Sequence, residues 1–590
     1  MLKLPLEGQV DLDLNSATAR EEATAMTVAT HDGGERVLVK NARIWQWTHD
    51  KCTDQPAYQM AEWMLVAADG KIEQIGVGSP PNAGNDARQV DLNGALVLPG
   101  LQDAHIHAYY MGESAEFINL SGCASFDELK ERLRKYDRAN PEKSWIVGFG
   151  WEQDALSDTA RYPTRHDIDE VIKDRPVMLH RACWHIAVAN SKAFEVAGLD
   201  VNRREWEVAS GEVDVDEHGA TGILREAAVE LIAKHTTESS DEIRLKYLRA
   251  SLRECIGYGL TAIQTNDHHA WELYRKLEAN GELPIRVYLT VPIDELGHQA
   301  TPKAGTSVGR LLSCKRIKIF SDGSLGAETA AMREPYRNTT NRGILMDTDE
   351  QLLKKVTDAT DAGYQLEIHA IAEQVLTALR KAQVAPDRRP VLTHCQVLGE
   401  DLIAQMKEQG VIGNIQPSFT ITDGAFARKR IPEHVIPFSY CWKRMMKSGV
   451  VCAGGSDAPI ETCNPFQGIF DAIYRHRPNN PSDIFLPDEC LTFEDALSLY
   501  TKNASFACME EKRLGNLQVG YQADFVVLRE DITNNHEALC SPTLVQSVWV
   551  SGKKSYEYDP NVTPSTSPDF SQSSLPGKNG RVRICACCRR

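Results

Sequence analysis

Six side chains in this sequence are of the types that bind divalent metal ions, and each lies at or near the end of a short apolar run. Two of them form the pattern His105-Ile106-His107. Because residues i and i+2 of a strand point to the same side, both imidazoles can reach one ion. The other four are spread over the rest of the chain: Lys318, His369, His394 and Asp457. Together the six residues predict a metal centre assembled from strand ends.

Lys318 lies within the apolar segment RIKIF, where an uncompensated ammonium group is costly to bury. Three interpretations are open. The side chain can extend its amine to solvent, it can form a Schiff base with a carbonyl substrate, or it can be carbamylated and bridge two ions. The nearby histidines favour carbamylation, because it converts the cation into an anion that suits a site containing divalent metal.

Asp457 follows a glycine-rich run, in the segment AGGSDAP. A carboxylate at such a strand end can touch both a metal ion and its bound water, which is the geometry of a general base. We therefore expect Asp457 to be a ligand and also the catalytic residue. As an isolated residue it would be an ordinary loop carboxylate, and His369 and His394 would be structural histidines. Their joint occurrence with the His-x-His pattern favours the metal centre.

Eight apolar runs, separated by helical stretches, carry or adjoin these residues. They are ALVLPGLQDAHIH, LTAIQTND, IRVYLTVP, RIKIFSDG, YQLEIHAI, PVLTHCQV, VIGNIQPS and VVCAGGSD. Strands alternating with helices predict an α/β fold with a parallel sheet, and eight strands close a (β/α)₈ TIM barrel. The carboxyl ends of barrel strands surround the active site, so residues far apart in sequence can converge there.

The remaining sequence is organised around this barrel. Strand-like segments with turn signals occur near both chain ends, and we expect them to pair in one small β-sandwich. The expected boundaries are a flexible leader at 1–35, an N-terminal sandwich segment at 36–98, the barrel at 99–514 with an insertion at about 108–260, a C-terminal sandwich segment at 515–558, and a disordered tail at 559–590. We expect the insertion, with its strand-like pieces SWIVGFGW and RPVMLHRA, to lie over the active-site face.

Composition limits the classes of partner and the cellular location. The 590 residues include 65 Lys and Arg against 82 Asp and Glu, for a net charge of −17, and no basic block is present to bind nucleic acid. No segment approaches the roughly 20 apolar residues that span a bilayer. The 15 Cys are scattered, which favours reduced thiols and a cytoplasmic protein. The expected partner is a small-molecule substrate. The composition leaves open whether the protein forms a homo-oligomer.

Several longer motifs resemble those of the amidohydrolase superfamily, in the branch of N-substituted formamide deformylase and related metal-dependent amidohydrolases. The motifs are VLPGLQDAHIH, KIFSDGSLGAETA, HAIAE, HCQV and GGSDAPIETCNPF, and the resemblance runs from about Val37 to Tyr556. It implies a β-sandwich beside the barrel, a centre of one or two divalent ions, and hydrolysis of an amide-like C–N bond that is not an ordinary peptide bond. The many histidines favour zinc.

The resemblance also implies individual ligand roles. His105, His107 and Asp457 would bind the first ion, and His369 and His394 the second, with Lys318 between the two.

The sequence departs from the family pattern in three places, one of which is Glu373, where an Asp is usual. His185 corresponds to a residue of the family's substrate pocket, but Cys183 and Trp184 replace the usual Asp-Gly before it, and a structural role is an alternative. Relatives also carry Arg and Glu where Val391 and Thr393 stand, which removes an expected support of the ligand His394.

Two other functions compete with a hydrolase. A Schiff-base lyase that uses Lys318 would leave four histidines at strand ends without a role. A catalytically silent regulatory or binding protein could keep the same fold, although the complete ligand set favours an enzyme. The sequence therefore predicts a metal-dependent hydrolase in which Asp457 takes a proton from metal-activated water and returns it to the leaving nitrogen.

Overall fold

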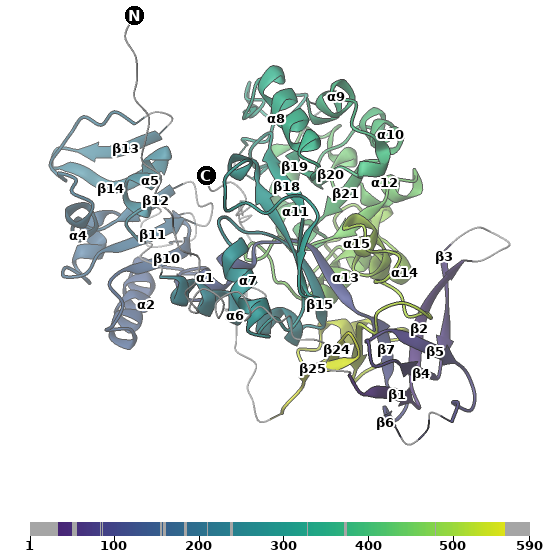
Figure 1. The fold of residues 1–590 in the computed structure, drawn as a ribbon. Coiled ribbons are helices and arrows are strands. Elements are labelled where there is room, and N and C mark those ends of the chain that lie inside the picture. The colour runs from purple at the N-terminus through teal and green to yellow at the C-terminus, as the bar shows by residue number, and fades with distance from the viewer. Residues whose placement is uncertain are drawn as a thin grey trace, which may run out of the picture.

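The computed structural model describes residues 34–49, 56–82, 84, 86–153, 156, 161–181, 186–208, 211–236, 240–326, 328–370, 374–477 and 480–560. The fold comprises a barrel, a two-sheet region built from both chain ends, and a lobe inserted into the barrel sequence (Figure 1). Segment 1–33, segment 561–590 and His185 lie outside the described residues, so the expectations for them stay predictions.

Eight parallel strands form the barrel. Seven lie within one of the eight predicted runs, and β18 begins four residues before its run RIKIFSDG. Their order in the sheet is β22, β21, β20, β19, β18, β16, β15 and β8, with the short strand β17 (Thr306–Val308) paired to the side of β18. The bounds are β8 (Leu101–Ile106), β15 (Leu260–Asn266), β16 (Arg286–Pro292), β18 (Leu312–Phe320), β19 (Gln365–Ala370), β20 (Val391–His394), β21 (Ile412–Ile415) and β22 (Cys452–Gly454). The predicted barrel is confirmed.

The two end strands of this sheet, β22 and β8, are joined at their carboxyl ends. The backbone N–H of Asp457 donates to the carbonyl of His105 at 2.8 Å, and the N–H of His107 donates to the carbonyl of Ala458 at 2.9 Å. The side-chain amide of Asn414, on β21, also donates to the carbonyl of Ala104 at 2.7 Å. Barrel closure therefore brings together the two segments that carry His105, His107 and Asp457.

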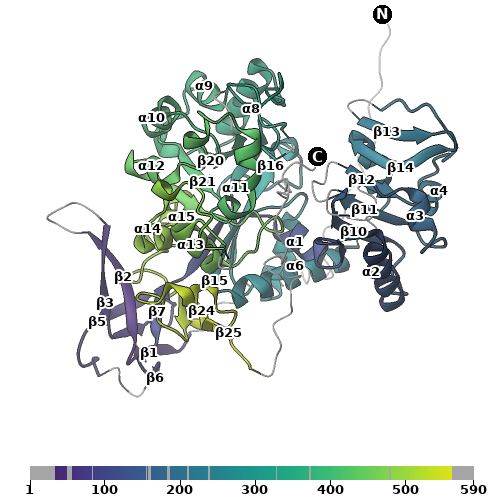
Figure 2. The ribbon, with the colours of Figure 1, turned by 180° about the vertical axis from the view of Figure 1, so that it is seen from behind.

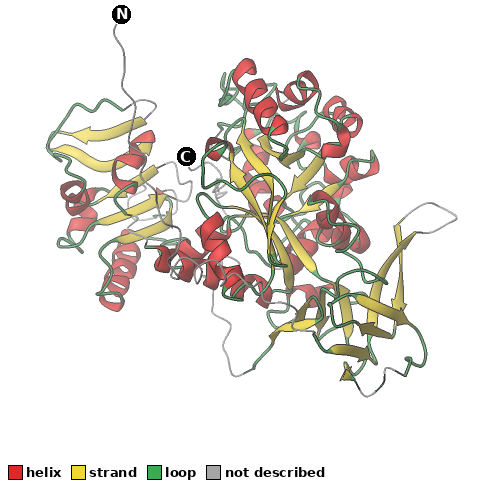
Figure 3. Cartoon of the chain, in the orientation of Figure 1, coloured by secondary structure: helices red, strands yellow, loops and turns green. Residues whose placement is uncertain are grey.

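Helices cover the outside of the barrel (Figure 3). They are α6 (Asp241–Gly257), α7 (Trp271–Ala279), α8 (Asp349–Asp361), α9 (Gln374–Lys381), α10 (Glu400–Glu408), α11 (Phe419–Arg430), α12 (Trp442–Lys447), α13 (Pro465–Tyr474), α14 (Phe493–Leu499) and α15 (Lys502–Ala507). Helix α8 begins with a capping box formed by Thr348 and Gln351, and its buried face carries Leu352, Val356 and Ala359 at helical spacing. None of the described helices is long and apolar enough to cross a membrane.

Both chain ends contribute to a pair of packed sheets beside the barrel (Figure 2). The six-stranded sheet has the order β25, β24, β23, β7, β2, β3, and the four-stranded sheet has the order β5, β4, β1, β6. The bounds are β1 (Arg36–Lys40), β2 (Arg43–His49), β3 (Pro56–Ala61), β4 (Trp63–Val66), β5 (Ile72–Gly76), β6 (Ala87–Asp91), β7 (Leu96–Pro99), β23 (Phe525–Leu528), β24 (Val545–Val550) and β25 (Lys553–Glu557).

Pairing across the two chain ends holds this region together. Strand β7 runs antiparallel to β23, with Val97 opposite Val527. The core shared by the two sheets includes Val39 from the N-terminal segment and Phe525 and Trp549 from the C-terminal segment. Since neither segment can form this core alone, the predicted sandwich built from both chain ends is confirmed.

The insertion between β8 and β15 forms a lobe with its own six-stranded sheet, which stands beside the barrel (Figure 1). Its elements are β9 (Ile118–Asn119), α2 (Phe126–Ala139), β10 (Ile146–Trp151), α3 (Arg165–Asp169), β11 (Val177–Arg181), β12 (Ile186–Ala189), α4 (Ser191–Val196), β13 (Gly211–Asp216), β14 (Gly219–Glu226) and α5 (Glu230–Ala233). Helix α1 (Ala108–Ser114) packs against α6 and leads into the lobe. The two predicted strand-like pieces contain β10 and β11, and the position of the lobe over the active-site face stays a prediction.

Candidate metal centre

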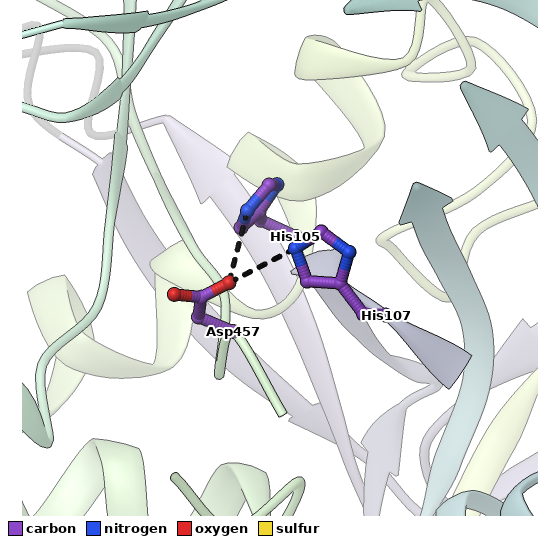
Figure 4. A group of neighbouring side chains, drawn as sticks. All are labelled: His105, His107 and Asp457. Carbon is purple, nitrogen blue, oxygen red and sulfur yellow. Dashed lines mark ion pairs between the residues drawn. The ribbon is translucent and has the colours of Figure 1, made fainter. Parts of the chain in front are cut away.

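Three of the predicted ligands meet at the carboxyl end of the barrel strands (Figure 4). His105 lies in β8, His107 follows this strand, and Asp457 follows β22. The Nε2 atoms of both histidines lie 3.2 Å from the same carboxylate oxygen, Oδ1 of Asp457. One potential ligand atom from each of the three residues lies within 4.8 Å of the others, and all three side chains are buried.

The atoms that face one another at this point lack hydrogen-bond partners. Nε2 of His105, Nε2 of His107 and both carboxylate oxygens of Asp457 are buried without a hydrogen bond among the described residues. A buried polar atom left unsatisfied costs about 1–3 kcal/mol. A divalent cation would satisfy these atoms together, and imidazole nitrogen and carboxylate oxygen are donors that zinc accepts. The residues therefore fit a metal ion.

The opposite ring nitrogens of the two histidines are held by neighbouring strands. His107 donates from Nδ1 to the carbonyl of Asn266, at the end of β15, over 2.9 Å. Nδ1 of His105 lies 2.7 Å from Oε1 of Glu367, on β19, and Asn266 Nδ2 donates to the same oxygen at 2.9 Å. A hydrogen on each Nδ1 leaves the lone pair on each Nε2, which is the tautomer that a metal ligand needs.

Glu367 is a site residue that sequence reasoning missed. Its carboxylate is fully buried, with Lys318 Nζ 3.1 Å from Oε1 and Arg316 Nη1 3.0 Å from Oε2. The available signal was a carboxylate inside an apolar strand, two residues before His369 and therefore on the same side of that strand. Because Lys318 is only 1% exposed, the interpretation in which its amine reaches solvent is wrong.

His369 and His394 lie at the same end of the barrel, beside the three clustered residues. Their rings are 4.6 Å apart between centroids, and the His394 ring is 5.7 Å from that of His105. Nδ1 of His369 lies 3.0 Å from Oδ1 of Asp322, and Nδ1 of His394 lies 2.9 Å from Oε1 of Gln416. Gln416, which sequence reasoning also missed, thus supports His394 although Val391 and Thr393 depart from the family pattern.

Backbone conformation marks two of these residues as unusual. Asp457 has a φ of 57° and His394 a φ of 84°, a left-handed region that few residues other than glycine adopt. Such conformations cost about 1–3 kcal/mol each and occur preferentially at functional sites. Both side chains are thereby turned toward the centre by the strand-to-loop connections that follow β20 and β22.

At His369, His394 and Asp457 the electrostatic environment favours the protonation states of metal ligands. Burial, assisted by the charge of Lys318, lowers the pKa of His369 to about 3, and burial lowers the pKa of His394 well below its ordinary value. Burial alone would raise the pKa of Asp457, but the neighbouring rings of His105 and His107 outweigh it and hold the pKa of this carboxyl below its usual range. Near neutral pH these groups are neutral imidazoles and a carboxylate, as metal binding requires.

Aromatic side chains surround three of the four histidines. The centroid distances are 6.2 Å for Tyr110 and His107, 5.9 Å for Phe320 and His369, and 6.0 Å for Phe419 and His394. Tyr110 and Phe320 are partly exposed, whereas Phe419 is buried. Aromatic rings therefore lie beside the centre in addition to the polar side chains that contact its histidines.

Comparison with protein families gives a match over most of the chain. Residues 88–556 match the model of the amidohydrolase family. Among curated relatives, the putative amidohydrolase YtcJ of Bacillus subtilis (strain 168) is 32% identical over 488 residues, covering 79% of this chain and 89% of YtcJ. Protein LONG AFTER FAR-RED 3 of Arabidopsis thaliana is 29% identical, covering 88% of this chain and 91% of that protein. N-substituted formamide deformylase of Arthrobacter pascens is 25% identical, with coverages of 84% and 94%.

A solved structure extends this similarity to three dimensions. The crystal structure of an uncharacterized metal-dependent hydrolase from Pyrococcus horikoshii OT3 superposes with a TM-score of 0.71 at 26% identity. The match covers 85% of this chain and 99% of that one. The match therefore extends over nearly the whole length of the neighbour.

Proposed function

The chain belongs to the amidohydrolase family, and from this premise we propose that it hydrolyses an amide-like C–N bond, other than an ordinary peptide bond, in a small molecule. The observation that carries the proposal is the convergence of four buried, unpartnered donor atoms from His105, His107 and Asp457. The name of its relative N-substituted formamide deformylase supports the choice of an amide-like bond.

The proposed cofactor is zinc, since the donors are mainly imidazole nitrogens. His105, His107 and Asp457 would hold a first ion. His369 and His394 would hold a second, with a carbamylated Lys318 between them. When bound, the metal would supply a water of lowered pKa and polarise the carbonyl of the substrate.

Within this scheme Asp457 moves the proton. Its carboxylate is ionised, and Oδ1 lies 3.2 Å from Nε2 of both His105 and His107, so it can accept a proton from the attacking water and return it to the departing nitrogen. Protonation of that nitrogen matters because an amide anion is a poor leaving group. Glu367 and Asn266 hold the histidine rings in the tautomer described above, and burial of the centre excludes bulk water from the reacting atoms.

The aromatic rings near the histidines favour one class of substrate over another. Tyr110 and Phe320 are partly exposed beside two of the histidines, and Lys318 and Arg316 both face Glu367. Arg316 is thus engaged by a protein carboxylate, and a carbamylated Lys318 would carry a negative charge rather than a free positive one. An uncharged amide with an apolar group next to the scissile bond fits these surroundings better than an anionic one, because apolar contacts are available and a free cation is lacking among these residues.

The experiment measures zinc per chain and then hydrolysis of a panel of N-formyl and N-acetyl amides with aliphatic, aromatic or carboxylate-bearing substituents. We expect stoichiometric metal and turnover that depends on it, with the uncharged apolar members preferred. The alternative, a catalytically silent protein on the same fold, is favoured by its relative LONG AFTER FAR-RED 3, whose name describes no reaction. Full metal occupancy without turnover of any member would support that alternative.

A further inference from the structure

A polar cavity of about 370 Å³ lies between the barrel and the terminal sheets, away from the metal centre. Arg286, the first residue of β16, and Ser313, near the start of β18, line it from the barrel, while Lys71 lines it from the sheet region. The cavity therefore opens at the amino ends of the barrel strands. Lys318 lies five residues after Ser313 in β18, which is about 16 Å along a strand that rises about 3.3 Å per residue. The cavity and the metal centre therefore lie at opposite ends of the barrel.

The lining of this cavity is unusually cationic for a chain with a net charge of −17. The charged lining residues are four cations and two anions: Lys71, Arg286, Arg310, Arg513, Asp69 and Glu510. A local excess of positive charge in a strongly acidic protein attracts anions, and a concave, partly buried site strengthens that attraction.

Most of the anionic charge near the cavity is already engaged. Asp524, behind the wall, accepts two hydrogen bonds from Arg286 at 2.7 and 3.0 Å. Glu510 is shared between Arg513 and Lys315, whose Nζ lies 2.5 Å from Oε1.

One positive charge remains without a matching carboxylate. Asp69 lies 3.5 Å from Lys71. Counting Lys315, Asp524 and Glu278, whose Oε1 accepts from the backbone N–H of Arg310 at 2.7 Å, five cations face four carboxylates. The side chain of Arg310 has no partner among the described residues.

Two hydroxyl groups in the wall have hydrogen-bonding capacity to spare. Oγ of Ser313 is buried, with the residue 8% exposed, and has no hydrogen-bond partner in the described part of the chain. The Tyr288 hydroxyl accepts from Arg513 Nη2 at 3.4 Å and keeps its own hydrogen to donate. A buried unsatisfied hydroxyl is costly, so a ligand with acceptor oxygens would relieve it.

We propose that this cavity binds a small oxyanion carrying at least two negative charges, such as phosphate or a small polycarboxylate. Arginine side chains bind planar and tetrahedral oxyanions through paired N–H donors, and the spare hydroxyls supply further donors. Because residues of the barrel and of the sheet region both line the cavity, the bound anion joins these two regions of the chain. This site is independent of the proposed hydrolysis.

The test follows thermal unfolding of the full-length, zinc-loaded protein against inorganic phosphate and, separately, citrate, at constant ionic strength. We expect a saturable rise of Tm with at least one of them, as a ligand specific to the folded state produces. The anion that saturates at the lower concentration identifies the preferred class. Arg310→Glu should abolish the rise and Ser313→Ala should raise the half-saturating concentration several-fold, with isothermal titration calorimetry as a second readout.

Two controls separate this cavity from other effects of anions. Arg342→Glu changes an exposed arginine on the loop between β18 and α8, and should leave the rise unchanged. His105→Ala should also keep the rise of Tm. If phosphate bound at the metal centre instead of the cavity, this variant would lose the rise. A rise that survives Arg310→Glu, disappears in His105→Ala, or fails to saturate would overturn the proposal.

Discussion

Oε1 of Glu367 lies 2.7 Å from Nδ1 of His105, and neither side chain is exposed. The same carboxylate group also faces Lys318 and Arg316. One buried residue therefore links a histidine of the compact cluster with the lysine expected to join two ions. A carboxylate on the outer nitrogen of a metal-binding histidine fixes the ring orientation and strengthens the ligand.

Glu367→Gln should weaken metal binding about 10–100-fold, the usual effect of losing such a support. The amide can still contact the ring, but it lacks the negative charge that balances Lys318 and Arg316. The measurement is competition for zinc against a chromophoric chelator. Glu334→Gln, an exposed change beside His434, is the matched control. Equal zinc affinity in the Glu367 variant and the wild type would remove this positioning role.

His105→Ala and His107→Ala should each lower bound zinc and remove turnover while leaving the barrel folded. Each substitution deletes one imidazole donor from the three-residue cluster without removing a strand of the sheet. Elemental analysis gives metal per chain, and circular dichroism reports the fold. His434→Ala, whose side chain is 68% exposed, should keep full metal content. Full metal and activity in both cluster variants would contradict the assignment.

Lys318 can be tested by replacement and by bicarbonate. If it is carbamylated, metal-free protein should regain more activity when zinc is added with bicarbonate than with zinc alone. Lys318→Glu should retain more metal than Lys318→Ala, because it supplies a carboxylate, whereas Lys318→Arg stays cationic and should retain little. Borohydride trapping with a carbonyl substrate would instead reveal a Schiff base. Reconstitution indifferent to bicarbonate, with an active arginine variant, would refute the bridging role.

A chain ending at residue 515 should fail to fold into a soluble protein. It lacks β23, β24 and β25, so β7 loses its antiparallel partner β23 and the sheet core loses Phe525 and Trp549. It also lacks Asp524, which leaves the guanidinium of Arg286 buried without its carboxylate, a costly state. A chain ending at 560, which keeps every described element, is the control and should match the wild type in Tm and activity. Soluble, active protein from the shorter chain would show that the pairing is dispensable.

Asp471 should make stability depend on pH in the range below neutrality. Burial raises the pKa of this α13 carboxyl from 3.8 to about 7, so folding takes up a proton between these two values. Its contribution is fully present below pH 3.8 and is lost as pH rises to about 7, by up to about 1.4 kcal/mol per pH unit. Asp471→Asn cannot ionise and still accepts the hydrogen bond from Gln467.

The measurement for Asp471 is the Tm of both proteins from pH 5 to pH 8. Relative to the wild type, Asp471→Asn should gain stability as pH rises, and the gain should level off above about pH 7. Asp69→Asn, an exposed change, serves as the control. A constant difference in Tm across this range would show that the carboxyl does not titrate there.

Local sequence was sufficient to predict the barrel strands and the three residues that cluster at their carboxyl ends. The apolar runs that end in His105, His369 and His394 correspond to barrel strands, because strand formation and strand polarity depend on patterns within a few residues. The His-x-His spacing likewise follows from the two-residue period of a single strand. Even the pairing of the two chain ends could be predicted, since each carries apolar strands that need a partner.

Tertiary structure alone decided which side chains support these ligands. Glu367 lies in β19, Asn266 ends β15 and Gln416 follows β21. No spacing in the sequence relates them to His105, His107 and His394. Their roles depend on barrel closure and on the register between neighbouring strands, which set distances of about 3 Å between residues tens to hundreds of positions apart. Short-range patterns carry no record of such distances, because the contacts form only when the whole sheet has closed.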